Sequence, residues 1–106
     1  MTFVRIIAAD EAAVSNALER YAEWLKERPE VLAVYLCGSW AKGNYTPYSD
    51  VDLLIVLEAD SRLPHDRVPE YLPEQFPVSM DLFVYTLEEI KSSPFAAELL
   101  KKAKQL

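Results

Sequence analysis

The stretch GSWAKGNYTPYSDVDLL, residues 38–54, holds the features that decide the fold. Both glycines of the chain, Gly38 and Gly43, lie in it, whereas average usage would place about seven glycines in a chain of this length. The apolar run 31–38 ends at the first glycine, and a second run, 51–57, follows the polar loop. Short apolar runs bounded by turn residues are typical of buried strands. The stretch therefore predicts two strands joined by a loop whose glycine backbone can approach a ligand closely.

Paired carboxylates open the second predicted strand. Asp50 and Asp52 are two residues apart, so strand geometry places their side chains on one face, with backbones roughly 7 Å apart. Like charges this close repel, and a divalent cation would relieve the repulsion. Mg²⁺ is commonly held by one or two carboxylates together with substrate phosphate oxygens. A helical turn opened by Gly38 and Ser39 would direct free N–H groups at such phosphates.

A third carboxylate, Asp81, lies on a predicted strand at residues 78–85, on its less apolar face. It is the natural third ligand of a cation held by the aspartate pair. The alternative is that each aspartate is an ordinary solvated residue of a turn, a strand end or an exposed face. That alternative does not explain why all three coincide with the glycine-serine turn.

The remaining patterns predict flanking helices. Apolar residues recur every three or four positions over residues 11–28, which indicates an amphipathic helix with Tyr21 and Trp24 in the core and Asp10 as its N-cap. Prolines limit residues 61–77 to a connector with at most a turn or two of helix. Thr86 with Glu89, and Ser93 before a proline, are helix-start signals, the second for a helix through residue 104. With three strands among these helices, the pattern predicts an α+β (mixed α/β) fold.

Composition limits the class of protein. The 106 residues predict a single domain spanning 1–106. Seventeen acidic and eleven basic residues give a net charge of −6, which argues against stable binding to a nucleic-acid backbone. Cys37 is the only cysteine and lies in an apolar run, so it is expected to be a buried apolar residue. The sequence has neither a signal-peptide pattern nor an apolar run long enough to cross a membrane, which predicts a cytoplasmic protein.

The order G-S-W-A-K-G, N-Y-T-P-Y and S-D-V-D-L resembles the signature of minimal nucleotidyltransferases of the DNA polymerase β superfamily. The similarity covers residues 31–85. It implies a polymerase β-like fold, a small mixed sheet of at least three strands with flanking helices. It also implies that Gly38 and Ser39 hold a triphosphate, that Asp50 and Asp52 bind metal, and that Asp81 is the third catalytic and metal-binding carboxylate.

The same resemblance assigns Lys42 and Ser49 to nucleotide binding, with ATP as substrate and one or two Mg²⁺ ions. Many relatives have arginine in place of Lys42, and the two are not equivalent at a bidentate phosphate contact. Trp40 and Tyr48 flank the motif and are candidates for contact with a base.

The function implied by the resemblance is transfer of AMP to a hydroxyl of a partner protein, with a small helical HEPN-type toxin as the candidate partner. A non-catalytic module that neutralises such a partner by contact is an alternative, and a small-molecule acceptor is a less favoured one. Homo- and hetero-oligomers both stay open. No further strand is expected in the last residues, KKAKQL, and Phe83 and Tyr85 are expected to form an exposed aromatic surface for a partner.

Overall fold

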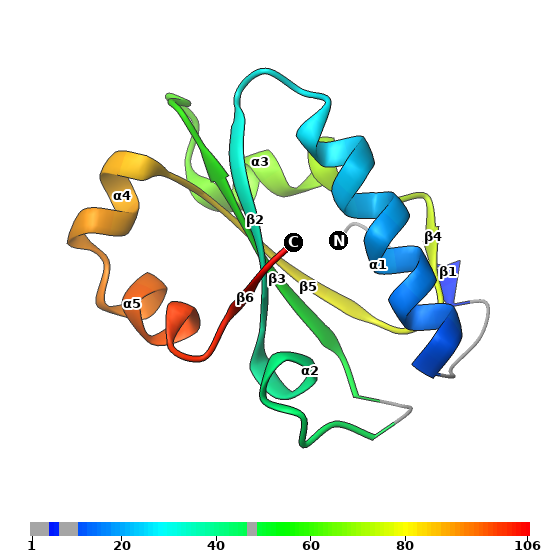
Figure 1. Ribbon diagram of the computed structural model, residues 1–106. Helices are drawn as coiled ribbons and strands as arrows, with labels where there is room; N and C mark the ends of the chain where they lie inside the picture. Colours follow the sequence, from blue (N-terminus) through cyan, green and yellow to red (C-terminus); the bar gives the residue numbers. More distant parts are fainter. Residues whose placement is uncertain (1–4, 7–10, 47–48) are drawn as a thin grey trace.

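The computed structural model of the protein (Figure 1) describes residues 5–6, 11–46 and 49–106. Asp10, the expected cap of the first helix, and Tyr48, a candidate for base contact, lie outside the described residues. In chain order, the described elements are β1 (Arg5–Ile6), α1 (Glu11–Lys26), β2 (Val31–Cys37), α2 (Gly38–Lys42), β3 (Val51–Leu57), α3 (Pro64–Tyr71), β4 (Gln75–Phe76), β5 (Met80–Thr86), α4 (Leu87–Ser92), α5 (Pro94–Leu100) and β6 (Lys104–Gln105).

A mixed four-stranded sheet of order β5-β3-β2-β6 forms the centre of the fold. Strand β3 pairs antiparallel with β2 and parallel with β5, and β6 pairs antiparallel with the other edge of β2. The short strands β1 and β4 form a separate parallel pair. The predicted α+β fold with a small mixed sheet and flanking helices is therefore confirmed.

Helices cover both faces of the sheet (Figure 1). On one face, the apolar stripe of α1 and Tyr71 of α3 pack against alternate residues of the strands. On the other face, Leu54 and Val56 pack against residues of α4 and α5. Strand β3 is buried on both sides, which explains why its sequence is continuously apolar after Asp52 rather than alternating.

The predicted element ends are right to within a few residues. Helix α1 ends at Lys26 rather than Arg28, because the Arg28 N–H bonds to the Leu25 carbonyl in a tighter final turn. The proline-rich connector holds the short helix α3, which begins at Pro64, where the missing N–H has no helical partner to lose. No helix in the described part of the chain combines the length and apolar character needed to cross a membrane.

The C-terminal prediction is wrong in two respects. Helix α5 ends at Leu100 instead of continuing through residue 104, and Lys104–Gln105 form strand β6 beside β2. The pairing is extended by a hydrogen bond from the Leu106 N–H to the Val34 carbonyl, 2.8 Å long. A strand of two polar residues shows no alternation of apolar and polar positions from which it could be predicted. It forms because the unpaired backbone groups along the edge of β2 accept it as a partner.

Two predictions about aromatic residues are also wrong. Phe83 and Tyr85 are only partly exposed, because Phe95 of α5 packs edge-on against both rings at centroid distances of 5.1 and 6.4 Å. Trp24 is 41% exposed rather than part of the core, and the Arg28 guanidinium lies 4.6 Å from its ring. The expected aromatic partner surface on β5 is therefore covered by the chain's own last helix.

Candidate active site

Three neighbouring strands bring the predicted site residues together at one end of the sheet, where β2 ends and β3 and β5 begin. Cys37, the last residue of β2, pairs with Asp52, and Asp52 pairs in parallel register with Asp81 of β5. Helix α2 begins at Gly38, directly after β2. Because adjacent strands are about 4.8 Å apart, the glycine turn and two of the aspartates lie side by side.

Gly38 makes the closest approach in this cluster. Its φ is +67°, a left-handed conformation that side chains other than glycine rarely adopt. A Cβ placed on Gly38 would lie 2.2 Å from Oδ2 of Asp52. The sequence suggested that this glycine lets a ligand approach the backbone. The structure adds that glycine is needed here because the Asp52 carboxylate occupies the space of a side chain.

Asp52 is electrostatically perturbed. Its pKa is raised above the ordinary value, first by burial, then by the charges of Asp81 and Asp50, and by a hydrogen bond with Asp81. Asp52 is half-buried, whereas Asp50 and Asp81 are exposed. Among the described residues, no three His, Cys, Asp or Glu side chains are already gathered as a metal-ligand set. The cluster is thus a carboxylate pair, Asp52 with Asp81, with the charge of Asp50 close enough to act on it.

The loop between α2 and β3 is tied to the helix by Trp40. The Trp40 indole N–H donates to the Ser49 carbonyl at 2.9 Å, and its ring stacks on Tyr45 with centroids 3.9 Å apart. Trp40 is only 6% exposed, so the expectation that it contacts a base is not supported by its position. Its role is to hold the segment that leads into Asp50.

Ser49 also acts within this loop. Its hydroxyl accepts a 2.8 Å hydrogen bond from the Thr46 N–H, and its own N–H donates to the Thr46 carbonyl. The two bonds join Thr46 to Ser49 immediately before the first aspartate. This arrangement fixes the direction in which the chain enters β3.

Lys42 and Cys37 occupy different environments beside the turn. Lys42 is exposed at the end of α2; the pKa of Glu98 on α5 is lowered mainly by the hydrogen bond and charge of Lys101, with a smaller effect of Lys42. Cys37 is 1% exposed, and burial, followed by the charge of Asp52, raises its thiol pKa to about 11. The predicted burial of the cysteine is confirmed, and a thiol of this pKa stays protonated at neutral pH.

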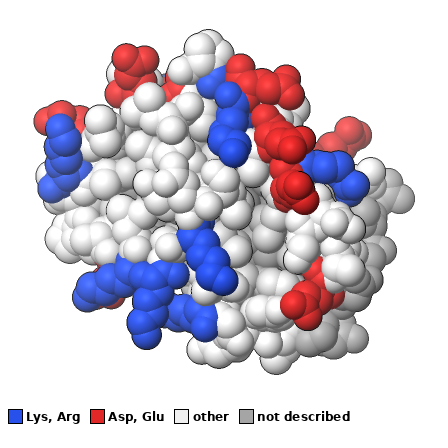
Figure 2. Space-filling model, in the orientation of Figure 1, with Lys and Arg blue, Asp and Glu red and all other residues white. Residues whose placement is uncertain are grey.

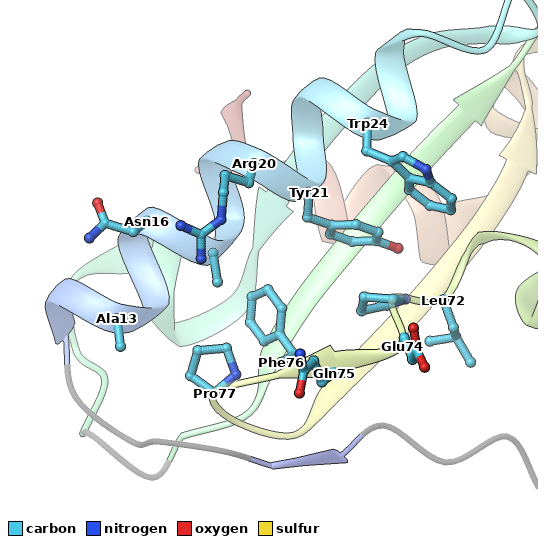
Figure 3. Close-up of a pocket in the computed structure, with 12 residues that line it drawn as sticks. Ala13, Asn16, Arg20, Tyr21, Trp24, Leu72, Glu74, Gln75, Phe76 and Pro77 are labelled. Carbon is cyan, nitrogen blue, oxygen red and sulfur yellow. The ribbon is translucent and has the colours of Figure 1, made fainter.

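A separate cavity of about 660 Å³ lies between α1 and the segment that leads into β5 (Figure 3). Tyr21 and Trp24 line one side and Phe76 lies opposite, while Arg20 and Glu74 supply charge. The cavity contains no residue of the glycine turn and none of the three aspartates. It is therefore distinct from the carboxylate cluster.

A buried arginine was not anticipated from the sequence. Arg67 of α3 is 1% exposed and bonds to both carboxylate oxygens of Glu89, at 2.6 and 2.9 Å, and to the Val84 carbonyl at 3.1 Å. Glu89 also completes the capping box with Thr86, as its sequence spacing predicted. The pair joins α3 to the end of β5 and the start of α4, a structural role.

Comparison with known proteins agrees with this geometry. A family model described as a nucleotidyltransferase domain matches residues 18–106. The chain therefore belongs to the family of nucleotidyltransferase domains, and the carboxylates lie within the matched region. The resemblance noted in the sequence is confirmed at the level of the family.

Two individual relatives are informative. A protein of Methanocaldococcus jannaschii named as a "putative protein adenylyltransferase" is 31% identical over 64 residues, which are 58% of this chain and 42% of that protein. The chain thus spans less than half the length of this relative. A crystal structure described as a "putative nucleotidyltransferase" from Sulfolobus solfataricus superposes with a TM-score of 0.56 over 91% of this chain and 86% of that one, at 21% identity. This second likeness supports the fold alone.

Proposed function

We propose that the protein transfers a nucleoside monophosphate, AMP from ATP, to a hydroxyl group of a partner protein. The observation that carries the proposal is the pairing of Asp52 with Asp81 on adjacent strands, against the backbone of Gly38, in a nucleotidyltransferase domain. In this reaction, the acceptor oxygen forms a bond to the α-phosphorus while the bond to the β-phosphate oxygen breaks. Pyrophosphate leaves with the electrons of that bond.

The donor chemistry of the cluster suits Mg²⁺. Asp50 and Asp52 supply carboxylate oxygens, which this ion prefers, and two carboxylates together with substrate phosphates are a common set. The pKa of Asp52 is raised first by burial and then by the charges of Asp81 and Asp50, and a bound cation would offset that repulsion. When bound, Mg²⁺ would neutralise charge on the phosphates and on the leaving oxygen. One or two ions are compatible with this assignment.

The chain's own residues then have separate tasks. Gly38 and Ser39 would hold the phosphates against the backbone at the start of α2, with Lys42 and Ser49 at the margins of the nucleotide. Asp81 would orient the acceptor hydroxyl and accept its proton, since an exposed carboxylate at the sheet edge can reach an incoming group. This division leaves Asp50 and Asp52 for the cation.

The proposed acceptor is a protein, and a HEPN-type helical toxin is the candidate partner. The name of the M. jannaschii relative, which refers to protein adenylylation, supports the acceptor class. The protein would then act as the antitoxin of a toxin-antitoxin pair. The cytoplasm is the proposed compartment, since the reaction consumes ATP.

The test is label transfer from [α-³²P]ATP to candidate partners, with and without Mg²⁺. Label on the partner that disappears in the Asp50→Asn and Asp52→Asn variants is the expected result. The same variants decide between catalysis and neutralisation by contact. If they still neutralise the partner while failing to label it, contact suffices and transfer is not the protein's role.

A further inference from the structure

The loop that leads from α2 into Asp50 is attached to the rest of the molecule by side chains. Within the described residues, no backbone hydrogen bond joins Asn44, Tyr45 or Ser49 to an element outside the loop. A backbone that forms no such bonds is free to move unless side chains hold it. The position of Asp50 therefore depends on the side-chain contacts that this loop makes.

Two aromatic rings form the first of these contacts. The rings of Trp40 and Tyr45 lie 3.9 Å apart and within 9° of parallel. Trp40 belongs to the buried core, and Tyr45 packs against that core while half-buried. The indole N–H of Trp40 also holds the far end of the loop through the Ser49 carbonyl. One buried ring thus contacts both ends of the loop.

A second contact reaches a different element. The Tyr45 hydroxyl donates a 2.6 Å hydrogen bond to Oε1 of Glu11, the first residue of α1 and 34 residues earlier in the chain. The start of α1 lies beside this loop in Figure 1. The bond to Glu11 is the main cause that raises the pKa of Tyr45, so the hydroxyl stays a donor at neutral pH. Bonds with a charged acceptor are stronger than neutral ones.

The carboxylate of Glu11 has no cation beside it. No ion pair joins it to a basic side chain in the described part of the protein. In Figure 2, basic side chains gather toward the lower left, and none lies at the lower right, where α1 begins in Figure 1. The contact that remains for this carboxylate is the Tyr45 hydroxyl.

We infer that Glu11 and Tyr45 are positioning residues for the metal site, which act on Asp50 through Trp40 and Ser49. The hydrogen bond holds the loop from α1, and the ring stack holds it from α2. Asp50 then projects from a backbone that is fixed before any cation binds. The inference rests on the proposed function, in which Asp50 is a ligand of Mg²⁺. It extends the site to the start of α1.

Three variants separate the hydrogen bond from the charge. Tyr45→Phe keeps the stacked ring and removes the hydroxyl. Glu11→Ala removes the acceptor together with a negative charge that favours the start of a helix. Glu11→Gln removes the same charge but keeps an oxygen that can accept from Tyr45. Glu19→Ala, which changes another exposed acid of α1, is the matched control.

The first measurement is amide hydrogen exchange of the metal-free protein. Tyr45→Phe and Glu11→Ala should speed exchange of the Tyr45 and Ser49 amides about two- to tenfold, as expected for loss of one hydrogen bond. Glu11→Gln and Glu19→Ala should exchange like the wild type. Faster exchange spread over the whole sheet would mean a general loss of stability and would overturn the inference.

The second measurement is Mn²⁺ affinity, by calorimetry in the presence of an ATP analogue with an uncleavable α–β bridge. Loss of a group that supports a metal ligand typically costs about 10–100-fold in affinity. Because Tyr45 and Glu11 act through other residues, Tyr45→Phe and Glu11→Ala should each weaken binding about three- to tenfold. The double variant should lose no more than either single one, since both remove the same bond.

The outcomes distinguish this inference from the proposed function. Weaker Mn²⁺ binding with faster exchange confined to the loop supports it. If the wild type binds Mn²⁺ and Tyr45→Phe binds it equally well, the inference fails while the proposed function stands. It also fails if Glu11→Gln loses as much affinity as Glu11→Ala, because charge and not the bond would then matter. If the wild type binds no Mn²⁺ with the analogue, both fall.

Discussion

Replacement of Gly38 by alanine is the perturbation for which the structure gives the sharpest expectation. Gly38 and Gly43 both have positive φ, +67° and +84°. Their surroundings differ, because a Cβ on Gly38 would lie 2.2 Å from Asp52 Oδ2, whereas nothing lies within 4 Å of one on Gly43. The two substitutions therefore share a backbone penalty and differ in one contact.

The backbone term is about 1–2 kcal/mol for each variant. For a domain of this size, that corresponds to a fall in Tm of roughly 4–16 °C. In Gly38→Ala, the Asp52 carboxylate must also retreat by about 1 Å to reach an ordinary contact distance, and a displacement of this size in a catalytic group can cost about 100-fold in rate. Gly43→Ala should keep its transfer rate to within a few fold.

The assays are thermal unfolding and label transfer under single-turnover conditions. Both variants should lose the backbone term, Gly38→Ala should lose additional stability through the contact with Asp52, and only Gly38→Ala should also lose transfer. A double-mutant cycle adds a check, because Asp52→Ala removes the clashing oxygen and should reduce the stability cost of Gly38→Ala to that of Gly43→Ala. Equal transfer rates in the two glycine variants would refute the reasoning that Gly38 makes room for Asp52.

Three further predictions concern the carboxylates and the supports of the site. Folding raises the pKa of Asp52, so the contribution of this group to stability is present below its unfolded pKa and is lost as the pH rises through the folded pKa. Without Mg²⁺, Asp52→Asn should therefore be more stable than the wild type at neutral pH. Urea titrations should show that this difference in the free energy of unfolding shrinks toward about pH 4. Glu89→Gln removes the charge that faces the buried Arg67 and should lower the free energy of unfolding by about 1–2 kcal/mol, less than for a fully buried pair because the Glu89 side chain is 36% exposed and Asp60 still lies 3.4 Å from Arg67; an unchanged urea midpoint would contradict that role. Trp40→Phe removes the 2.9 Å hydrogen bond to Ser49 and should cost about 1 kcal/mol, with faster amide exchange at the loop before β3 as its signature.

Much of the site was predictable because its residues are close in sequence or follow strand periodicity. The spacing of Asp50 and Asp52 and the apolar run after them placed β3, and alternation along residues 78–85 placed Asp81 on the face that it occupies. The cap signals at Thr86 and Ser93 also mark real helix starts, since these hydrogen bonds form between neighbours in the chain. The roles in catalysis assigned to these aspartates stay predictions.

Other features could not be read from local patterns. Trp24 was expected in the core and is exposed, whereas Trp40 was expected to contact a base and is buried. Burial depends on which elements pack over a side chain and not only on its place in a helical stripe. Likewise, Phe95 covers the aromatic face of β5 only because the chain returns through α5. Arg67 gave no signal, since its partners are distant in sequence.

By itself, the sequence indicated the class of the protein and predicted the residues of its candidate site, because a glycine-serine turn followed by paired aspartates depends on short-range spacing. The tertiary structure decided three things: the register that sets Asp52 beside Asp81, the contact that requires glycine at position 38, and the pairing that adds Lys104 to the sheet beside β2. Each depends on hydrogen bonding or close contact between segments far apart in the chain. Such pairings are selected by the whole sheet, and no single segment encodes them.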